Sequence, residues 1–581
     1  MIIFKKLYNF LNKKEKKQII YFVVFLLIST ILETISISLI FPALSLIIDT
    51  ADKSRFILIW EFFPMLKNIS TVNLILIFVG VFFVINLMKT SFLIYFSWWR
   101  NDFIFNLDKN INKNLYIKYI KSPLSYFSNK NSSTFTKNII NESKKIRVSI
   151  DACLKIFTEL FVIITVSVVL IFYQPIPSLF ILIFFGSFGL ITNKVLRSRI
   201  HKYGSENVIQ MEKVFINLKD VFGSFKDIKI RNNYNYFLDK FSLSLSKALK
   251  TQKYLFFISE TVKFLFELLA ILFFCFLIFL LININLNPKD IIPSLGLFAV
   301  AAYRFLPGIN RVIVYFQAIQ SSKSAINLLY KDLKKKDAEH AIDNEKKLAF
   351  KKEIYFKNIS FKYPKTSNYI LKKFNLKIKK NDFICISGES GKGKTTFLDL
   401  LSGLLKPISG EILVDKINIH KNPRVWINNI GYVQQKVYLM DDSIKNNIAF
   451  DGKKIDKKKL NYAIKFSQLD KLIKNKKGGL NSKVGDDGIK LSGGQVKRIG
   501  IARSLYHMPK VLIYDEITSS LDKETEKNIL KTLITLTKNL TVIFITHRPE
   551  IIKGEKVKKF ILSKKGHTTI LRKLRGKKLK N

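Results

Sequence analysis

Six long apolar stretches fill the first half of this 581-residue chain and constrain its fold more than any other feature. A helix needs about 20 predominantly apolar residues to cross the hydrocarbon core of a bilayer. The stretches therefore predict an all-α transmembrane domain with six spans, and the chain is long enough to hold a second domain behind it. The predicted spans are residues 19–48, 72–99, 150–173, 177–193, 256–286 and 291–318, within a transmembrane domain at 1–330.

Basic side chains crowd the two longest connections between these stretches, residues 101–149 and 194–253. An excess of Lys and Arg keeps a connection cytoplasmic, so we expect both termini in the cytosol. Each of these connections is too long to be a structureless loop, and its apolar residues have helical spacing. We therefore expect the membrane helices to continue into the cytosol as helical hairpins.

The net charge of the chain is strongly positive, with 96 Lys and Arg against 43 Asp and Glu. Such a balance is compatible with nucleic acid, an anionic membrane surface or an acidic ligand. The abundance of Lys, Asn, Ile and Phe fits the bias of an AT-rich genome equally well. The three cysteines, Cys153, Cys275 and Cys385, lie too far apart in the sequence for a disulfide framework or a metal motif.

The pattern changes after residue 330. Residues 331–350 are polar and charged, as expected of a linker, and short β-like runs then alternate with helical stretches. This alternation predicts a parallel sheet with helices on its faces. We place an α/β P-loop ATPase domain at residues 351–581.

A glycine-rich loop follows the apolar run at 383–387 and precedes a helical stretch. In that context backbone N–H groups converge on phosphate oxygens, and the helix N-terminus adds a favourable field. Lys394 is expected to reach the β- and γ-phosphates, and the Thr395 hydroxyl to bind Mg²⁺. The predicted phosphate-binding residues are Gly388, Glu389, Ser390, Gly391, Lys392, Gly393, Lys394, Thr395 and Thr396.

Two acidic residues end the apolar run Val511–Tyr514. Asp515 is suited to hold Mg²⁺, and Glu516 is suited to polarise the water that attacks the γ-phosphate. Further upstream, Leu491-Ser492-Gly493-Gly494-Gln495 precedes another helical pattern and predicts a second anion site at a helix N-terminus.

With these three motifs in this order, the chain resembles the ATP-binding-cassette (ABC) transporters. The resemblance implies that Ser492, Gly493, Gly494 and Gln495 contact ATP held by a second copy, so that a homodimer with ATP and Mg²⁺ as cofactors is expected. It also implies roles for Tyr363 on adenine, Gln435 at Mg²⁺, and His547 at the γ-phosphate beside the catalytic Glu516 and Lys394. Residues 519–522 match the loop that links the two ATP sites, and Gln434 replaces the usual proline before Gln435.

The order of the domains is similar to that of exporter-type half-transporters. That likeness implies short coupling helices at the ends of the cytosolic extensions, near Ser122–Ser128 and Phe222–Ile230. Through them, closure of the ATPase domains would turn the membrane cavity outward.

Charged residues inside predicted spans point to a cargo path, because such residues are costly in a bilayer. The first and last spans look like those of PglK-type flippases, which move lipid-linked oligosaccharides on a polyprenyl pyrophosphate to the outer leaflet. Arg304 and Arg311 match two arginines of that family's cavity, and Lys89 and Lys263 replace two others. Residues 54–67 resemble its outer amphipathic helix, although a plain interfacial helix is an equally good reading.

Other interpretations stay open. A lipid A-type lipid, a peptide or a drug could be the cargo of the same machine. A soluble ATPase acting on DNA would suit the charge, but the six apolar stretches exclude it, and no nucleic-acid partner is expected. The expected location is the plasma membrane of a bacterium, with membrane lipid and the cargo as the remaining partners.

Overall fold

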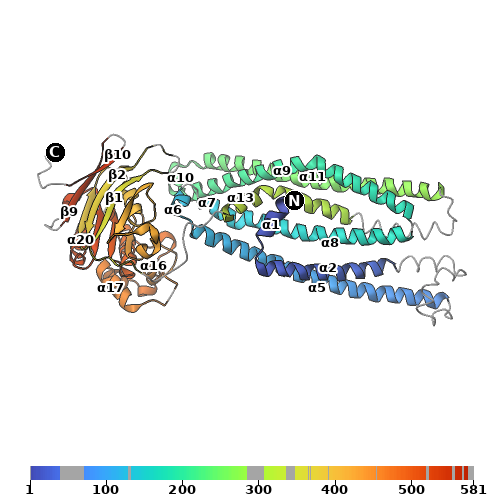
Figure 1. Cartoon of the computed structure of the whole chain (residues 1–581), viewed down its shortest axis with the longest axis horizontal. Coiled ribbons are helices and arrows are strands. Elements are labelled where there is room, and N and C mark those ends of the chain that lie inside the picture. The colour runs from blue at the N-terminus through green and yellow to red at the C-terminus, as the bar shows by residue number, and fades with distance from the viewer. Residues whose placement is uncertain are drawn as a thin grey trace. The chain divides into compact units, whose positions relative to one another are not determined.

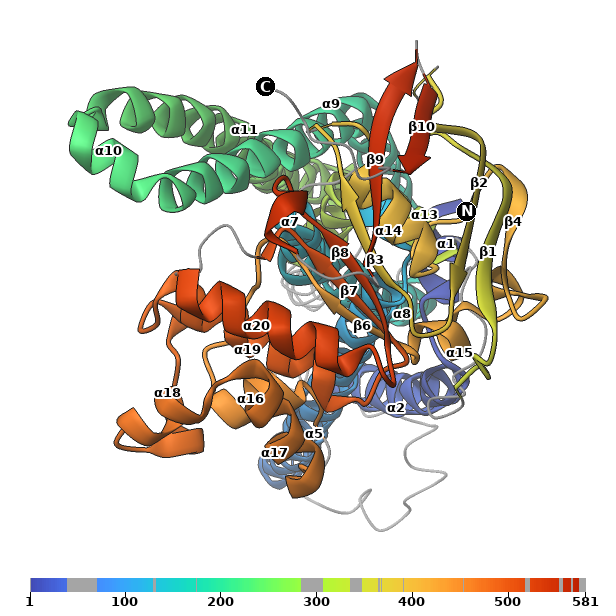
Figure 2. The ribbon, with the colours of Figure 1, turned by 90° about the vertical axis from the view of Figure 1, so that its left-hand side faces the viewer.

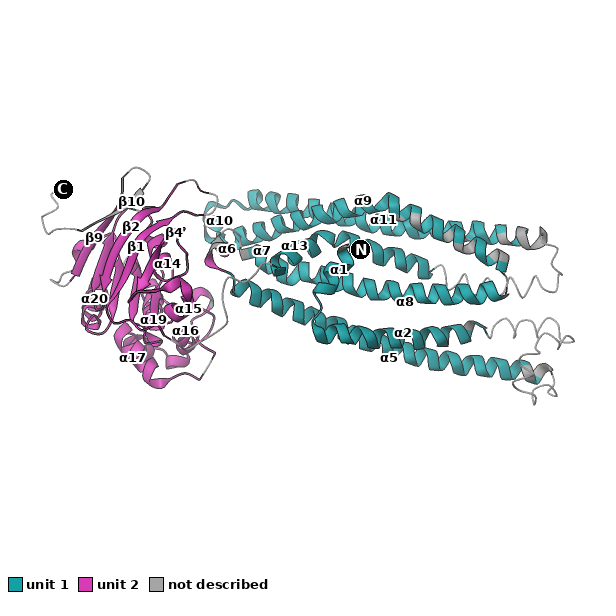
Figure 3. Cartoon of the chain, viewed as in Figure 1, with its two compact units in different colours: residues 1–122, 129–337 teal, residues 123–128, 338–581 magenta. Residues whose placement is uncertain are grey.

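The computed structural model divides the chain into two compact units (Figure 3). One unit comprises residues 1–122 and 129–337, and the other comprises residues 123–128 and 338–581. The structure describes residues 2–38, 71–128, 132–173, 175–283, 307–334, 347–363, 366, 368–389, 391–452, 454–517, 523–552, 557–565 and 568–573.

The first unit is helical, with its longest helices side by side (Figure 1). At about 1.5 Å per residue, a 50-residue helix such as α5 is far longer than the roughly 30 Å hydrocarbon core. The expected extension of the membrane helices is therefore present. The helices are α1 (Ile2–Asn9), α2 (Lys13–Ser38), α5 (Thr71–Ile120), α7 (Ser132–Lys137), the π-helical turn η3 (Asn138–Glu142), α8 (Ser143–Tyr173), α9 (Pro175–Gly223), α10 (Phe225–Arg231), α11 (Tyr234–Asn283), residues 307–321 and α13 (Lys323–Lys334).

Three helices in the described part of the chain are long and apolar enough to cross a membrane: Lys13–Ser36, Ile75–Ile120 and Ser133–Phe172. They correspond to the first three predicted spans. Residues 284–306, which include parts of the last two predicted spans, lie outside the described ranges. The number of six spans therefore stays a prediction.

The antiparallel helices α9 and α11 form a hairpin through aromatic and amide pairs along their length. Phe188 packs edge-on against Phe266, with ring centroids 4.8 Å apart, and Tyr203 stacks on Tyr254. Beyond the apolar part, the Asn207 amide donates to the Thr251 hydroxyl at 3.0 Å. Since aromatic pairs and buried amide bonds both add to packing energy, the hairpin is held from its apolar end to its polar end, where α10 joins the two helices.

The second unit contains a ten-stranded mixed sheet in the order β5-β4-β1-β2-β10-β9-β3-β8-β7-β6. Strands β3, β8, β7 and β6 are parallel neighbours, whereas β1 pairs antiparallel with β2 and β4. The strands are β1 (Glu353–Phe361), β2 (Leu371–Lys379), β3 (Phe383–Ser387), β4 (Ser409–Val414), β5 (Ile417–Asn418), β6 (Ile430–Val433), β7 (Val511–Asp515), β8 (Thr541–Ile545), β9 (Val557–Lys565) and β10 (Thr568–Lys573).

Helices cover both faces of the parallel strands, as the sequence predicts (Figure 2). Alternate residues of β3 enter different cores, because side chains alternate across a strand: Ile384 joins the core that contains α14, and Cys385 joins the core beneath α16, α17, α19 and α20. The helices of this unit are α6 (Leu124–Ser128), α14 (Lys394–Leu401), α15 (Pro423–Ile427), α16 (Ile444–Ala449), α17 (Lys457–Ser467), α18 (Asp470–Asn475), α19 (Gly493–Tyr506) and α20 (Lys523–Leu536).

Helix α13 includes the first four residues of the predicted linker, 331–334. Helix α13 continues to Lys334, because Leu329 and Asp332 are buried and the Asp332 carboxylate accepts a 3.0 Å hydrogen bond from Tyr119 on α5. Residues 331–334 therefore belong to a packed helix. Short helices are present at both places where coupling helices are expected, α6 and α10.

Candidate nucleotide-binding site

The loop between β3 and α14 has the backbone geometry that phosphate binding requires. Gly391 and Gly393 adopt φ values of +76° and +89°, which favour glycine. At Gly388 a Cβ atom would lie 2.5 Å from the carbonyl oxygen of Leu562 on β9, so only glycine fits there. The loop therefore presents backbone N–H groups at the start of α14, although Ser390 lies outside the described residues.

The Glu516 carboxylate gathers side chains from three separate elements. Lys394 Nζ lies 3.0 Å from Glu516 Oε1, and His547 Nε2 lies 2.7 Å from the same oxygen. Gln435 Nε2 donates to Glu516 Oε2 at 2.8 Å. Four residues chosen from separate motifs thus meet at one point, which we name the Glu516 hub.

Two further contacts hold the ammonium group of Lys394 in place. Its Nζ donates to the Gly388 carbonyl at 2.7 Å and lies 3.2 Å from His547 Nε2. A phosphate that enters the loop would offer Lys394 and His547 an alternative anion to the Glu516 carboxylate. The hub is therefore suited to exchange one set of charge-assisted hydrogen bonds for another.

Glu516 itself is fixed by its backbone. It follows β7, has a left-handed φ of +51°, and its N–H donates to the Ile545 carbonyl at 3.1 Å. A non-glycine residue in this conformation is uncommon and usually marks a constrained position. The constraint turns the side chain away from the strand and toward the phosphate loop.

Two buried carboxyl groups, those of Asp515 and Asp399, lie beside the hub. Burial and the neighbouring Glu516 raise the pKa of Asp515, while Lys394 and a hydrogen bond from Tyr432 oppose that shift. Burial and the charge of Asp515 raise the pKa of Asp399 to about 6. Two carboxyl groups in one low-dielectric site repel each other when both are ionised, and a bound cation would relieve that repulsion.

The donor set fits Mg²⁺. Thr395 offers a hydroxyl, Gln435 an amide oxygen and Asp515 a buried carboxylate, and hard oxygen ligands of this kind are the ones Mg²⁺ prefers. These three residues are the ones that would hold the ion together with nucleotide phosphates.

Tyr363 lies next to the same helix. Its hydroxyl is 3.2 Å from Thr396 Oγ1, and its ring packs edge-on against Phe361 at a centroid distance of 5.2 Å. The ring is thus positioned beside the phosphate loop, where an adenine could stack on it.

Residues 491–495, which we call the signature segment, form a capped helix N-terminus on a different part of the unit. Ser492 Oγ accepts from Gln495 N at 3.3 Å, and Ser492 N donates to Gln495 Oε1 at 3.1 Å, which is a capping box. Ser492 and Gly493 are exposed at the start of α19. Helix α19 packs with α16 and α17 in one hydrophobic core of this unit, whereas α14 packs in the other core (Figure 2). The residues predicted to form a second anion site therefore lie at an exposed helix N-terminus.

Comparison with known proteins agrees with this geometry. Residues 371–519 match the ABC transporter family, and residues 18–303 match the ABC transporter transmembrane region. The fold resembles the structure of a bacterial Atm1-family ABC exporter with ATP bound, with a TM-score of 0.77 and 18% identity over 94% of this chain and 93% of that one.

Two relatives illustrate the sequence similarity. The ATP-dependent lipid A-core flippase of Wigglesworthia glossinidia brevipalpis is 28% identical over 76% of this chain and 77% of its own length. The alpha-hemolysin translocation ATP-binding protein HlyB of Escherichia coli O157:H7 is 39% identical over 35% of this chain, and the match spans 29% of that protein.

The chain thus has the architecture of a membrane-embedded exporter joined to a nucleotide-hydrolysing domain. It belongs to the ABC transporters, as an exporter half-transporter with an ATPase domain that uses ATP and Mg²⁺.

Three of the four cationic residues predicted to bind cargo lie in the described ranges, and each of them faces its own acid. Arg311 makes a bidentate pair with Glu159 of α8, at 2.7 Å and 3.0 Å. Lys89 of α5 lies 3.6 Å from Glu33 of α2, and both side chains are largely buried. Lys263 lies 3.8 Å from Glu267 in an exposed pair on α11. Arg304 and the outer segment 54–67 lie outside the described residues, as does the predicted loop 519–522.

Sequence reasoning missed several residues that the structure places at these sites. Tyr432 and Asp399 accompany Asp515, and Glu159 accompanies Arg311. Glu159 carried a signal, because it is an acid inside a predicted span. The sequence gives no such signal for Asp399 and Tyr432. A single polar residue on a helix or strand is common, and only the folded structure shows that these two lie beside Asp515.

Proposed function

We propose that the chain works as a homodimer that uses ATP to move a lipid-linked oligosaccharide from the cytosolic to the outer leaflet of a bacterial plasma membrane. The proposal includes six spans, and both termini and the ATPase domain in the cytosol. The Glu516 hub is the observation that carries the ATP-driven part.

The exposed start of helix α19 supports the proposed dimer. Ser492 caps α19 and faces solvent, while the phosphate loop lies at α14. If both contact one nucleotide, the signature segment must come from a second copy, and a symmetric pair gives two equivalent sites. Closure of the two copies around ATP is the step that supplies mechanical work.

Residues of this chain then have separate roles. Glu516 orients and polarises the attacking water, while Lys394 and His547 leave its carboxylate to stabilise phosphate oxygens. Gln435 links the site to the surface of the domain. Helices α6 and α10 are proposed as the coupling elements, and the grouping of residues 123–128 with the ATPase unit supports this role for α6.

Two observations support this cargo. The first and last predicted spans have a PglK-like sequence, and the first unit of the chain, which we call the membrane unit, contains the ion pairs described above. Arg311 already holds a carboxylate in a two-pronged arrangement, and a pyrophosphate presents the same geometry with more charge. Arg311 is therefore proposed to exchange Glu159 for the pyrophosphate of the cargo. Lys89 and Lys263 are proposed to add charge to the same path, with Arg304.

A second candidate is an acidic lipid of the lipid A type, favoured by the lipid A-core flippase similarity over 76% of this chain. Such a lipid carries phosphates on an apolar anchor, so the same cations would serve it. Peptide or drug export has no comparable support from the membrane unit.

The test is a translocation assay in proteoliposomes that contain the full-length protein and ATP. One set carries a fluorescent polyprenyl-pyrophosphate oligosaccharide and a matched set carries fluorescent lipid A. We expect ATP-dependent movement of the oligosaccharide lipid, which Glu516→Gln abolishes. Movement of lipid A alone would replace the cargo assignment, and movement of neither would leave only the exporter class.

A further inference from the structure

A cavity of about 400 Å³ lies within the membrane unit, between α1, α9, residues 307–321 and α13. Three cationic side chains line it: Lys6, Arg197 and Lys323. Much of the remaining wall is apolar and includes Phe4, Phe316 and Ile319. A volume of this size is within the range of small-molecule sites.

The three cations have no acidic partner within the described ranges of the chain. No Asp or Glu lines the cavity, and the Lys6 ammonium donates to the neutral Asn327 side chain. Burial first, and then the charges of Lys323 and Arg197, lower the pKa of His201 on α9. The cations of this cavity therefore differ from Lys89, Lys263 and Arg311, each of which faces a carboxylate.

The depth of the cavity suits the headgroup layer of the inner leaflet. Arg197 follows the predicted end of a span at residue 193 by about 6 Å of helix, and Lys323 follows residue 318 by about 8 Å. The polar layer on each side of the hydrocarbon core is roughly 5–8 Å thick. Both cations would thus lie among lipid phosphates, with the apolar residues on the hydrocarbon side.

A tight contact between helices keeps this depth fixed. A Cβ atom on Gly204 of α9 would lie 2.5 Å from the backbone oxygen of Ser321, so the two helices touch there. Arg197 lies two helical turns from this contact, since seven residues span about two turns. The distance between Arg197 and Lys323 is therefore set by packed backbone.

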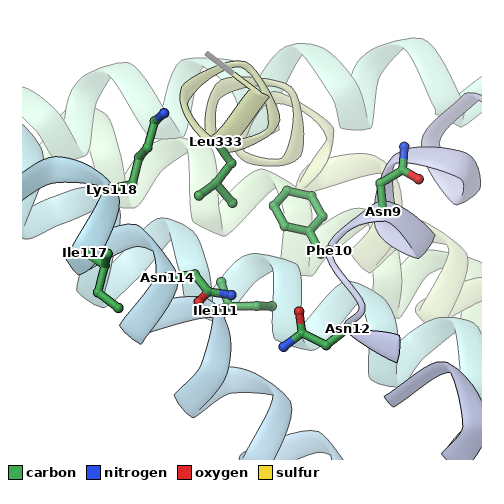
Figure 4. A pocket seen from close by; sticks show the side chains of 8 residues that line it. All are labelled: Asn9, Phe10, Asn12, Ile111, Asn114, Ile117, Lys118 and Leu333. Carbon is green, nitrogen blue, oxygen red and sulfur yellow. The ribbon is translucent and has the colours of Figure 1, made fainter. Parts of the chain in front are cut away.

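A second cavity of the same unit provides a contrast. It has a volume of about 310 Å³ and is lined by Asn9, Asn12, Asn114 and Lys118 together with apolar residues (Figure 4). Lys118 lies about 28 Å along α5 from the predicted end of a span at residue 99, too far for a lipid headgroup. Of these two cavities, the first combines several cations, apolar walls and the right depth, and the second does not.

We infer that the cavity lined by Lys6, Arg197 and Lys323 binds the phosphate headgroup of an anionic phospholipid of the inner leaflet. An acyl chain lies against Phe4, Phe316 and Ile319. Lys and Arg pair strongly with phosphate oxygens, and basic groups at the membrane surface attract anionic lipid. The inference depends on the cytosolic orientation proposed above and not on the identity of the cargo.

The experiment is native mass spectrometry of the full-length protein with phosphatidylglycerol, with phosphatidylcholine as the neutral comparison. The test variant is Lys6→Gln/Arg197→Gln/Lys323→Gln. The matched control is Lys5→Gln/Lys202→Gln/Lys331→Gln, which removes three exposed cations from the same three helices. Polyprenyl phosphate and inorganic phosphate form two further arms, and Arg197→Lys tests whether charge alone suffices.

We expect the unsubstituted protein to prefer phosphatidylglycerol over phosphatidylcholine. The test variant should lose affinity for phosphatidylglycerol on the order of a hundredfold, given roughly fivefold per cation, and at least tenfold more than the control. Arg197→Lys should keep most of the preference. Equal losses in both triple variants, or no preference between the two lipids, would overturn the inference.

The other arms separate the sources of phosphate. Equally tight binding of inorganic phosphate would mean that the apolar wall plays no part, which also contradicts the inference. Binding of polyprenyl phosphate in place of phosphatidylglycerol would make the cavity a cargo site and not a phospholipid site. If phosphatidylglycerol binds as expected while the proteoliposome assay shows no oligosaccharide movement, the proposed cargo fails and this site stands.

Discussion

In the nucleotide site one carboxylate, Glu516, gathers side chains from three elements. In the membrane unit, by contrast, each described cation of the predicted cargo path, Lys89, Lys263 or Arg311, faces its own acid. The first arrangement concentrates charge where a phosphate enters and is ready to be exchanged. The second balances charge pair by pair along different helices. Ion pairs removed from water are costly to break, since a lone buried charge is left behind.

This difference indicates that binding energy is needed in different steps at the two sites. At the Glu516 hub, an incoming phosphate meets Lys394 and His547 already oriented. In the membrane unit, a cargo phosphate must first separate a pair such as Arg311–Glu159. We therefore expect substitutions in the hub to act on hydrolysis itself, and substitutions of the pairs to act mainly on the cargo.

The largest effect is expected from Glu516→Gln. Loss of the carboxylate removes the group that polarises water, so ATP hydrolysis should fall on the order of a thousandfold, while nucleotide binding persists because the phosphate loop is intact. Phosphate release by the purified protein measures ATP hydrolysis, and titration with a fluorescent nucleotide measures nucleotide binding. The control is Glu524→Gln, an exposed acid on α20. If the variant kept more than a tenth of the ATPase activity, the proposed role of Glu516 in hydrolysis would be contradicted.

A large effect on stability is expected from Asp399→Asn. The folded-state pKa of Asp399, about 6, exceeds its ordinary value of 3.8, so the folded protein binds a proton that the unfolded chain releases between these values. Stability therefore falls as the pH rises through this window. The neutral Asn should stabilise the nucleotide-free ATPase domain on the order of 2 kcal/mol at pH 7.5, and less at pH 5.

Thermal unfolding followed through tryptophan fluorescence tests this, since Trp426 is buried in the same core as α14. Asp415→Asn is the matched comparison with the opposite sign. Burial alone would raise the pKa of Asp415, but backbone N–H donors of Lys351, Glu353 and Lys352 outweigh it and lower the pKa. That variant should lose stability at pH 7.5. A loss in both variants would contradict the repulsion between Asp399 and Asp515.

In the membrane unit, Arg311→Gln should reduce cargo transport about tenfold, since charge-assisted hydrogen bonds contribute roughly 1.5–3 kcal/mol. Basal ATP hydrolysis should stay within about twofold, because the hub is untouched. Glu159→Gln should instead lower the apparent KM for cargo, as Arg311 no longer has to leave an acid. Proteoliposome transport and detergent-phase ATPase assays read the two quantities separately.

The exposed pair gives the comparison for that experiment. Lys263 and Glu267 are both about half exposed, and exposed helix pairs contribute only about 0.3–0.5 kcal/mol. Lys263→Gln should therefore affect transport less than Arg311→Gln. Equal effects would mean that burial of the pair is irrelevant to cargo recognition.

The smallest effect is expected at Tyr363. Tyr363→Ala should weaken ATP binding roughly three- to tenfold, as stacking of an aromatic ring contributes about 0.5–1.5 kcal/mol. Tyr363→Phe keeps the ring and should bind almost as well as the unsubstituted protein. Titration in a Glu516→Gln background, which does not turn over, measures both. An equal loss in the two variants would assign the effect to the contact between the Tyr363 hydroxyl and Thr396.

The nucleotide site could be predicted from sequence because its chemistry lies in short contiguous motifs. Parallel strands place their carboxyl ends at one edge of the sheet, so Gly388–Thr395, Asp515–Glu516 and His547 had to meet there. The great length of the helices could also be predicted, because the apolar runs continue into polar segments whose apolar residues have helical spacing. Asp399 and Tyr432 could not be anticipated, because only the packed structure brings them to Asp515.

The membrane pairs could not be predicted for a different reason. Arg311 and Glu159 lie on helices far apart in the sequence, and an apolar span gives little information about which face it turns to a neighbour. The same applies to Lys89 and Glu33. Single charges were visible in the sequence, but their partners depend on helix rotation, which the packing of large apolar side chains determines.

The most direct test of the account is whether each ATP site requires two copies of the chain. One copy carries Glu516→Gln and Glu389→Cys in the phosphate loop, and the other carries Glu516→Gln and Ser492→Cys at the signature helix. The three native cysteines are replaced by serine in both. With ATP and Mg²⁺, the account predicts a disulfide between the two copies that is absent without nucleotide. No crosslink between the copies in the presence of ATP, or a crosslink that forms equally well without ATP, would contradict it.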